Sequence, residues 1–124
     1  MSVAPRDRWF MTLRHASGEL RIHARVADRF LPRLIGLIGQ RTPPPAGTGL
    51  VLCPGGAVHT LGMRYPIDIL QLDRSLLVLT VSRRIPPRRI VPAPRRTALS
   101  LELAGGVTPP GITGCRFRCK EVVS

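Results

Sequence analysis

The segment that decides the fold class is Ile67–Val81, with the sequence IDILQLDRSLLVLTV. Two short aliphatic runs, Ile67–Leu72 and Leu76–Val81, flank the turn-forming residues Asp73-Arg74-Ser75. Branched aliphatic residues favour extended backbone, whereas Asp and Ser favour turns. The segment therefore predicts two paired strands joined by a tight turn.

Similar runs recur along the rest of the chain. Trp9–Leu13 and Leu20–Val26 flank a turn-forming link at His15–Gly18, which predicts a second hairpin. Leu20–Val26 alternates between apolar and polar residues, so we expect its arginines and His23 to face solvent. Further strands are predicted at Leu50–Cys53, Ala57–Thr60, Thr97–Leu103 and Cys115–Val123.

These elements predict a mainly β protein. We expect a compact β-sandwich or small barrel of roughly seven to eight short strands, because no long helices are available to connect parallel strands. One short helix is predicted near residues 29–38, where Asp28 can cap it. Gln40–Gly49, with the sequence QRTPPPAGTG, is expected to be a surface loop. The 124 residues should form a single domain, 1–124, with its core over about 9–123.

The chain is strongly basic, with 19 Lys and Arg against 7 Asp and Glu and a net charge of +12. Residues 83–96, RRIPPRRIVPAPRR, form an Arg/Pro-rich segment whose prolines restrict it to a sheet edge or a loop. Its arginines either reflect compositional bias or attract a polyanion, a nucleic acid or an acidic protein surface. Glu102 is expected to face outward and to form an ion pair with this segment. Only 4% of the residues are aromatic, which argues against a row of side chains on which nucleic-acid bases could stack. The candidate basic patch comprises Arg83, Arg84, Arg88, Arg89, Arg95 and Arg96.

The cysteines indicate a reducing compartment. Cys115 and Cys119 lie about 13 Å apart if both belong to one strand, too far for a disulfide, and we interpret them as small core residues. No Cys and His spacing fits structural zinc, so we expect neither a metal nor a cofactor. No apolar run approaches the roughly 20 residues that span a bilayer, and Trp9–Leu13 is short for a signal peptide. A cytoplasmic location is the resulting expectation.

Three stretches occur in a recognisable order: Arg33–Gly39 (RLIGLIG), His59–Ile69 (HTLGMRYPIDI) and Leu101–Gly105 (LELAG), with Gly114 after them. In order and spacing they resemble the family known as domain of unknown function 192, over about residues 20–117. The resemblance implies a compact, mainly β, jelly-roll-like fold and brings no assigned reaction. Many members of that family carry export signals, whereas we expect none in this chain.

The chain departs from the common pattern of that family. Ile38 stands where Met is usual, and Gln40 where Arg is usual. His59–Gly62 replaces an aromatic-Met-Lys-Asn sequence, although Met63 is kept, and Arg74-Ser75 occupies a turn that usually carries Gly. These differences indicate a divergent member, to which a ligand inferred for other members would transfer poorly.

The densest group of reactive side chains lies between Cys53 and Asp73. Asp68 shares a strand face with leucines, and a carboxylate removed from water needs hydrogen-bond donors. Arg64, His59 or the backbone of Gly62–Tyr65 could supply them. In the structural interpretation, which we favour, Asp68 ties down the turn at Pro66. In the functional interpretation, a small pocket binds a ligand through Cys53, His59, Met63, Arg64 and Asp68.

Three functions follow from these features. The leading hypothesis is a non-enzymatic binding or accessory module with a surface or pocket around residues 59–68. The second is a polyanion or nucleic-acid binder that uses Arg83–Arg96. The third is an enzyme in which His59 and Asp68 act as an acid and base pair, although the sequence offers no clear nucleophile or metal set.

Overall fold

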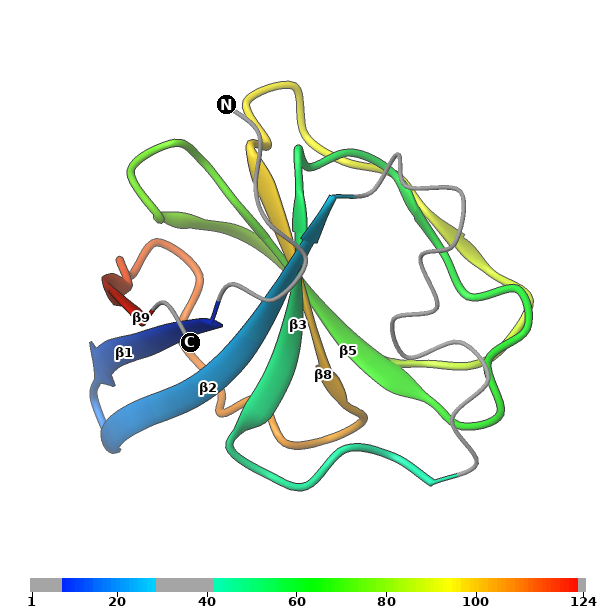
Figure 1. Cartoon of the computed structure of the whole chain (residues 1–124), viewed down its shortest axis with the longest axis horizontal. Helices are drawn as coiled ribbons and strands as arrows, with labels where there is room; N and C mark the ends of the chain where they lie inside the picture. The colour runs from blue at the N-terminus through cyan, green and yellow to red at the C-terminus, as the bar shows by residue number, and fades with distance from the viewer. Residues whose placement is uncertain (1–7, 29–41, 123–124) are drawn as a thin grey trace.

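The computed structural model describes residues 8–28 and 42–122, which form nine strands and no helix (Figure 1). The helix expected near residues 29–38 lies outside the described residues. Within the described part of the chain there is accordingly no helix long and apolar enough to cross a membrane. The strands are β1 (Arg8–His15), β2 (Gly18–Asp28), β3 (Thr48–Cys53), β4 (Val58–His59), β5 (Ile67–Leu72), β6 (Val78–Ile85), β7 (Ile90–Val91), β8 (Leu99–Ala104) and β9 (Arg118–Val122).

Seven strands form one curved sheet in the order β6-β5-β8-β3-β2-β1-β9, and β4 pairs with β7 in a separate two-stranded sheet. The large sheet curls into a half-barrel, which confirms the mainly β, barrel-like class (Figure 1). A β-bridge between Leu77 and Arg116 links the start of β6 to the chain entering β9. Strands β2 and β3 are parallel, whereas the other neighbouring strands pair antiparallel.

Both predicted hairpins are confirmed. Strands β1 and β2 pair from Arg8 opposite Arg25 to His15 opposite Gly18. Strands β5 and β6 pair across the expected turn, where Asp73 Oδ1 accepts the N–H of Ser75 at 2.8 Å and of Leu77 at 3.0 Å. The hydrogen bond from Leu77 is the main reason that the pKa of Asp73 lies below its usual value.

Apolar side chains gather in two clusters, one on each side of the sheet. Along β5, Leu70 and Leu72 belong to the main cluster, whereas Ile67 and Ile69 belong to the second, which also includes Val58 of β4 and Val91 of β7. Because strands β5 and β8 are covered on both faces, all six residues of each are buried. The main cluster comprises Met11, Leu13, Ile22, Ala24, Val26, Val51, Leu70, Leu72, Val78, Leu99, Leu101, Leu103, Ile112 and Phe117, and the second comprises Ala27, Leu50, Val58, Met63, Tyr65, Ile67, Ile69 and Val91.

Some local expectations need correction. Strand β3 begins at Thr48, inside the segment expected to be a loop, because it pairs with β2 there. Strand β6 continues to Ile85 and so includes the first two arginines of the Arg/Pro-rich segment, although its position at the sheet edge is as predicted. Cys119 is exposed rather than part of the core, because β9 is the other edge of the sheet, and Cys115 is half-buried.

Candidate functional site

Asp68 is fully buried, as the sequence predicted, but its hydrogen-bond partners are not the predicted ones. Its Oδ1 accepts the N–H of Arg84 at 2.8 Å and of Gly106 at 2.9 Å, and its Oδ2 accepts the N–H of Thr108 at 3.0 Å. Burial by itself would raise the pKa of Asp68, but the hydrogen bonds outweigh it and leave the pKa below its usual value. The carboxylate therefore stays charged with its oxygens engaged.

Asp68 holds together three segments of chain. Opposite it, the β5–β6 register shifts between Ile67 and Ile69, and Arg84 adopts a φ of 51°. A bulge of this kind leaves an N–H without a partner in the ladder, and Asp68 accepts it. The same carboxylate fixes the turn after β8 through Gly106. Asp68 thus has the structural role that we favoured, but it does not act on the turn at Pro66.

The other predicted ligand residues are dispersed. His59 on β4 and Arg64 in the following loop are exposed, and neither donates to Asp68. Met63 is buried in the second cluster, whereas Cys53 at the end of β3 packs against the main one. Because Asp68 is inaccessible and already accepts three N–H groups, it is poorly suited to act with His59 as an acid and base pair.

Thr60 joins the two segments that the sequence analysis treated as alternative binding surfaces. Its N–H donates to the carbonyl of Arg89 at 2.8 Å, and its Oγ1 accepts the N–H of Arg89 at 2.8 Å. Its hydroxyl also donates to the carbonyl of Pro86 at 2.7 Å. Leu61 and Ile90, which are 54% and 73% exposed, come from these two segments. The 59–64 loop and the 86–90 segment therefore form one surface.

Glu102 is buried, whereas we had expected it to face outward. Arg25, Leu50, Glu102 and Ile69 are successive partners across four strands, so their side chains share one face of the sheet. That face is exposed to solvent at Arg25 on β2, but at Glu102 on β8 it is covered by the second cluster. Burial raises the pKa of Glu102 to about 7. The pKa of Tyr65 is also raised, mainly by burial and to a smaller extent by the negative charge of Glu102.

The expected ion pair between Glu102 and the Arg/Pro-rich segment does not form, because the carboxyl is enclosed by the second cluster. Arg21 instead forms an ion pair with Glu19 at 3.0 Å. Within the Arg/Pro-rich segment, Arg83 donates instead to the carbonyl of Pro109 at 2.8 Å.

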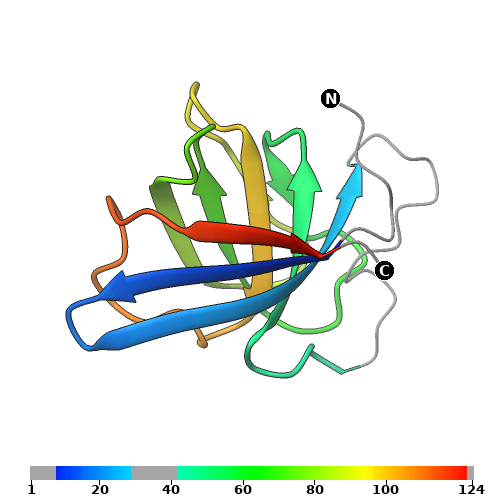
Figure 2. The same cartoon turned by 60° about the vertical axis from the view of Figure 1, so that its left-hand side comes forward.

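A basic surface that the sequence analysis did not assemble covers strands β9, β1 and β2. These strands run side by side (Figure 2), and alternation sends every second side chain outward. We call this surface the basic face; Phe10, Thr12, Glu19 and His23 lie on it. Its exposed cations are Arg8, Arg14, Arg21, Arg25, Arg118 and Lys120.

An aromatic pair lies in the middle of the basic face. Phe10 and His23 are direct cross-strand partners, and their rings stack with centroids 4.4 Å apart at an angle of 14°. Phe10 is 47% exposed, so the pair presents ring surface to solvent. On the other side of Phe10, Lys120 of β9 is its partner. The alternation in β2 could have indicated the exposed cations, but not the residues beside them.

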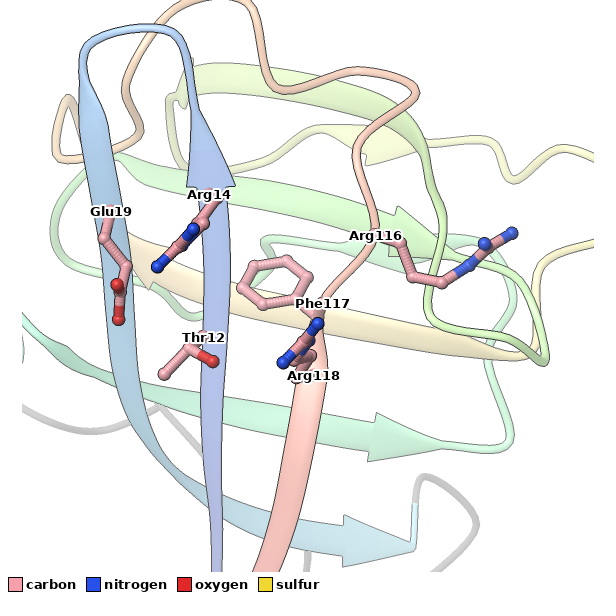
Figure 3. A pocket seen from close by; sticks show the side chains of 6 residues that line it. All are labelled: Thr12, Arg14, Glu19, Arg116, Phe117 and Arg118. Carbon is pink, nitrogen blue, oxygen red and sulfur yellow. The ribbon is translucent and has the colours of Figure 1, made fainter.

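A groove lies at each end of the basic face. The first, of about 640 Å³, is lined by Thr12, Arg14, Glu19, Arg116, Phe117 and Arg118. Figure 3 shows Arg14 directed toward Glu19 and Arg118 beside Thr12, whereas the side chain of Arg116 points away from these four residues. The second, of about 280 Å³, is lined by Arg8, His23, Arg25, Pro44, Pro45, Thr48, Gly49 and Leu50. A further groove, away from this face and of about 470 Å³, contains Arg74, Arg95 and Arg96.

The half-barrel and its arginine-lined grooves define a small basic β protein. Among protein families, the chain belongs to DUF192, described as "Uncharacterized ACR, COG1430", whose model matches residues 12–112. No curated protein matches the chain.

Two solved structures share the fold. One is a protein of unknown function from Novosphingobium aromaticivorans, with a TM-score of 0.75 and 19% identity over 95% of this chain and 89% of the other. The second is described as a "putative transcription regulator" from Sinorhizobium meliloti, with a TM-score of 0.74 and 21% identity over 96% of this chain and 98% of the other. At such identities the likeness concerns the fold alone.

Proposed function

We propose that this protein is a non-enzymatic binding module that binds polyanions on its basic face. The observation that carries the proposal is the gathering of six exposed cations on three adjacent strands, with a groove at each end. A surface of one charge sign attracts a polyanion and releases the counterions bound to it.

The distribution of acids supports this proposal over simple compositional bias. If arginines merely filled exposed positions, acidic side chains would be expected among them. Of the acids whose side chains the structure describes, Asp68 and Glu102 are buried and Asp73 closes the β5–β6 turn. Glu19 is the remaining one, and it pairs with Arg21. Among the side chains that the structure describes, the six cations of the basic face are therefore accompanied by one carboxylate, that of Glu19.

Heparin affinity at increasing salt tests the proposal. We expect the double variant Arg14→Gln/Arg118→Gln to elute at clearly lower salt than the unmodified protein, because each cation removed lowers the number of counterions that binding releases. The matched control, Arg95→Gln/Arg96→Gln, removes the same charge from the groove that lies elsewhere. Equal effects of the two variants would mean that net charge alone drives retention, and would refute the proposal.

A second candidate function is protein docking at the surface joined by Thr60. The observation in its favour is the exposure of Leu61 and Ile90 beside Arg88 and Arg89. Exposed apolar side chains flanked by cations suit an acidic peptide that also carries apolar residues. The affinity for such a peptide, measured by fluorescence anisotropy, should be weaker in Ile90→Ser and unchanged in Arg14→Gln/Arg118→Gln.

A further inference from the structure

We infer that the ligand of the basic face is a single-stranded nucleic acid, one of whose bases stacks on the Phe10–His23 ring pair. This inference rests on the proposed function and adds to it the chemical class of the polyanion. A sulfated polysaccharide or an acidic peptide needs only the cations, whereas the exposed rings provide a surface that nucleobases can use.

The sheet register places cations on both sides of the ring pair. Lys120, Phe10 and His23 form one row across the three strands. The next row toward the hairpin turn contains Arg118, Thr12 and Arg21, and the row in the other direction contains Arg8 and Arg25. Neighbouring rows on one face lie about 7 Å apart. An extended single strand, longer per nucleotide than the ~3.4 Å rise of a duplex, can therefore place phosphates beside the outer rows and a base at the rings.

The grooves extend this track in both directions. From Arg8 to Arg14 along β1 is about 20 Å, room for several nucleotides and near the lower end of the ~4–16 that a small β-barrel accommodates. At one end Arg14, Arg118 and the hydroxyl of Thr12 line the larger groove (Figure 3). At the other end His23 belongs to both the ring pair and the smaller groove, so the stacking surface and that groove are continuous.

The ring pair favours a single strand over a duplex. In a duplex the faces of the bases are occupied by their neighbours, and a base would have to leave the stack to reach Phe10. In a single strand the faces are accessible. Stacking on an aromatic side chain changes affinity by about 5- to 150-fold per base when the ring is removed.

The test compares ligands of equal charge with and without bases. We would measure fluorescence anisotropy with a labelled oligothymidine on the order of 12 nucleotides long, with an abasic strand of the same length, and with heparin as competitor. The unmodified protein should bind oligothymidine at least fivefold more tightly than the abasic strand. Phe10→Ala should lower the affinity for oligothymidine to that for the abasic strand, and Phe10→Trp should keep the preference. Leu61→Ala, which removes an exposed apolar side chain elsewhere, is the matched control and should also keep the preference.

The outcomes separate this inference from the proposed function. If the unmodified protein binds neither heparin nor either strand, the proposed function fails and the inference fails with it. If heparin and both strands bind equally well, or polyglutamate competes as well as oligothymidine, the inference alone is overturned. A duplex bound as tightly as the single strand would overturn it too. Thermal unfolding of Phe10→Ala verifies that any loss of binding is not a loss of fold.

Discussion

Replacing Glu102 by Gln should make the protein more stable at neutral and alkaline pH. Burial raises the pKa of Glu102 from 4.5 in the unfolded chain to about 7 in the folded protein. At about 1.4 kcal/mol per pKa unit, ionising this carboxyl in the folded state costs about 3 kcal/mol. Gln has nearly the same shape and never ionises, so the variant avoids this cost.

The sign of the pH dependence follows from proton binding. Between pH 4.5 and about 7 the folded state holds a proton on Glu102 that the unfolded chain has released. The contribution of Glu102 to the free energy of unfolding therefore falls as pH rises through this window, and is constant above it. Glu102→Gln should match the unmodified protein near pH 4 and exceed it by up to about 3 kcal/mol at pH 8.

Urea unfolding at pH 4, 6 and 8, followed by the fluorescence of the single tryptophan, Trp9, measures this difference. The groups that titrate in both proteins cancel when the two curves are subtracted. Glu19→Gln, at an exposed position, is the control and should change stability by less than about 0.5 kcal/mol at each pH. A Glu102→Gln variant whose stability differs from the unmodified protein by the same amount at every pH would refute the reasoning.

Four further substitutions, one of them a control, probe the fold around the site. Asp68→Asn leaves one acceptor oxygen for three N–H donors and should destabilise the protein by about 3 kcal/mol in urea unfolding. Because the pKa of Asp68 is lowered from 3.8 on folding, the unmodified protein should lose stability as pH falls below 3.8, and the variant should not show this part of the loss. Gly55→Ala would place a Cβ 2.7 Å from a backbone nitrogen at the start of β8 and should lower the free energy of unfolding by at least about 2 kcal/mol. The control Gly114→Ala, with nothing within 4 Å and a φ of 85°, should lower it by about 1 kcal/mol. Equal losses in the two variants would contradict the close contact at Gly55. Thr60→Val removes the acceptor of the Arg89 N–H, so hydrogen exchange at that amide should accelerate while the amides of β5 keep their protection.

The strands could be predicted from the sequence, whereas the surroundings of their side chains could not. The β1–β2 and β5–β6 hairpins depend on local alternation and turn residues, and both are present. Glu102 was misplaced because alternation in Leu99–Ala104 indicates two faces without indicating that both are covered. Whether a face is covered depends on segments distant in the chain, such as Val58 and Val91 of the second cluster.

The sequence by itself determined that this is a small, basic, mainly β protein with a buried carboxylate at position 68, because period-two alternation, turn chemistry and charge are properties of neighbouring residues. Only the tertiary structure decided which groups meet. The donors to Asp68 lie 16, 38 and 40 residues away from it. Phe10 and His23 meet in the local β1–β2 hairpin, but Lys120 joins them only because β9 pairs with β1. Contacts of this kind depend on strand order and register, which are set by the burial of the whole sheet rather than by any local pattern.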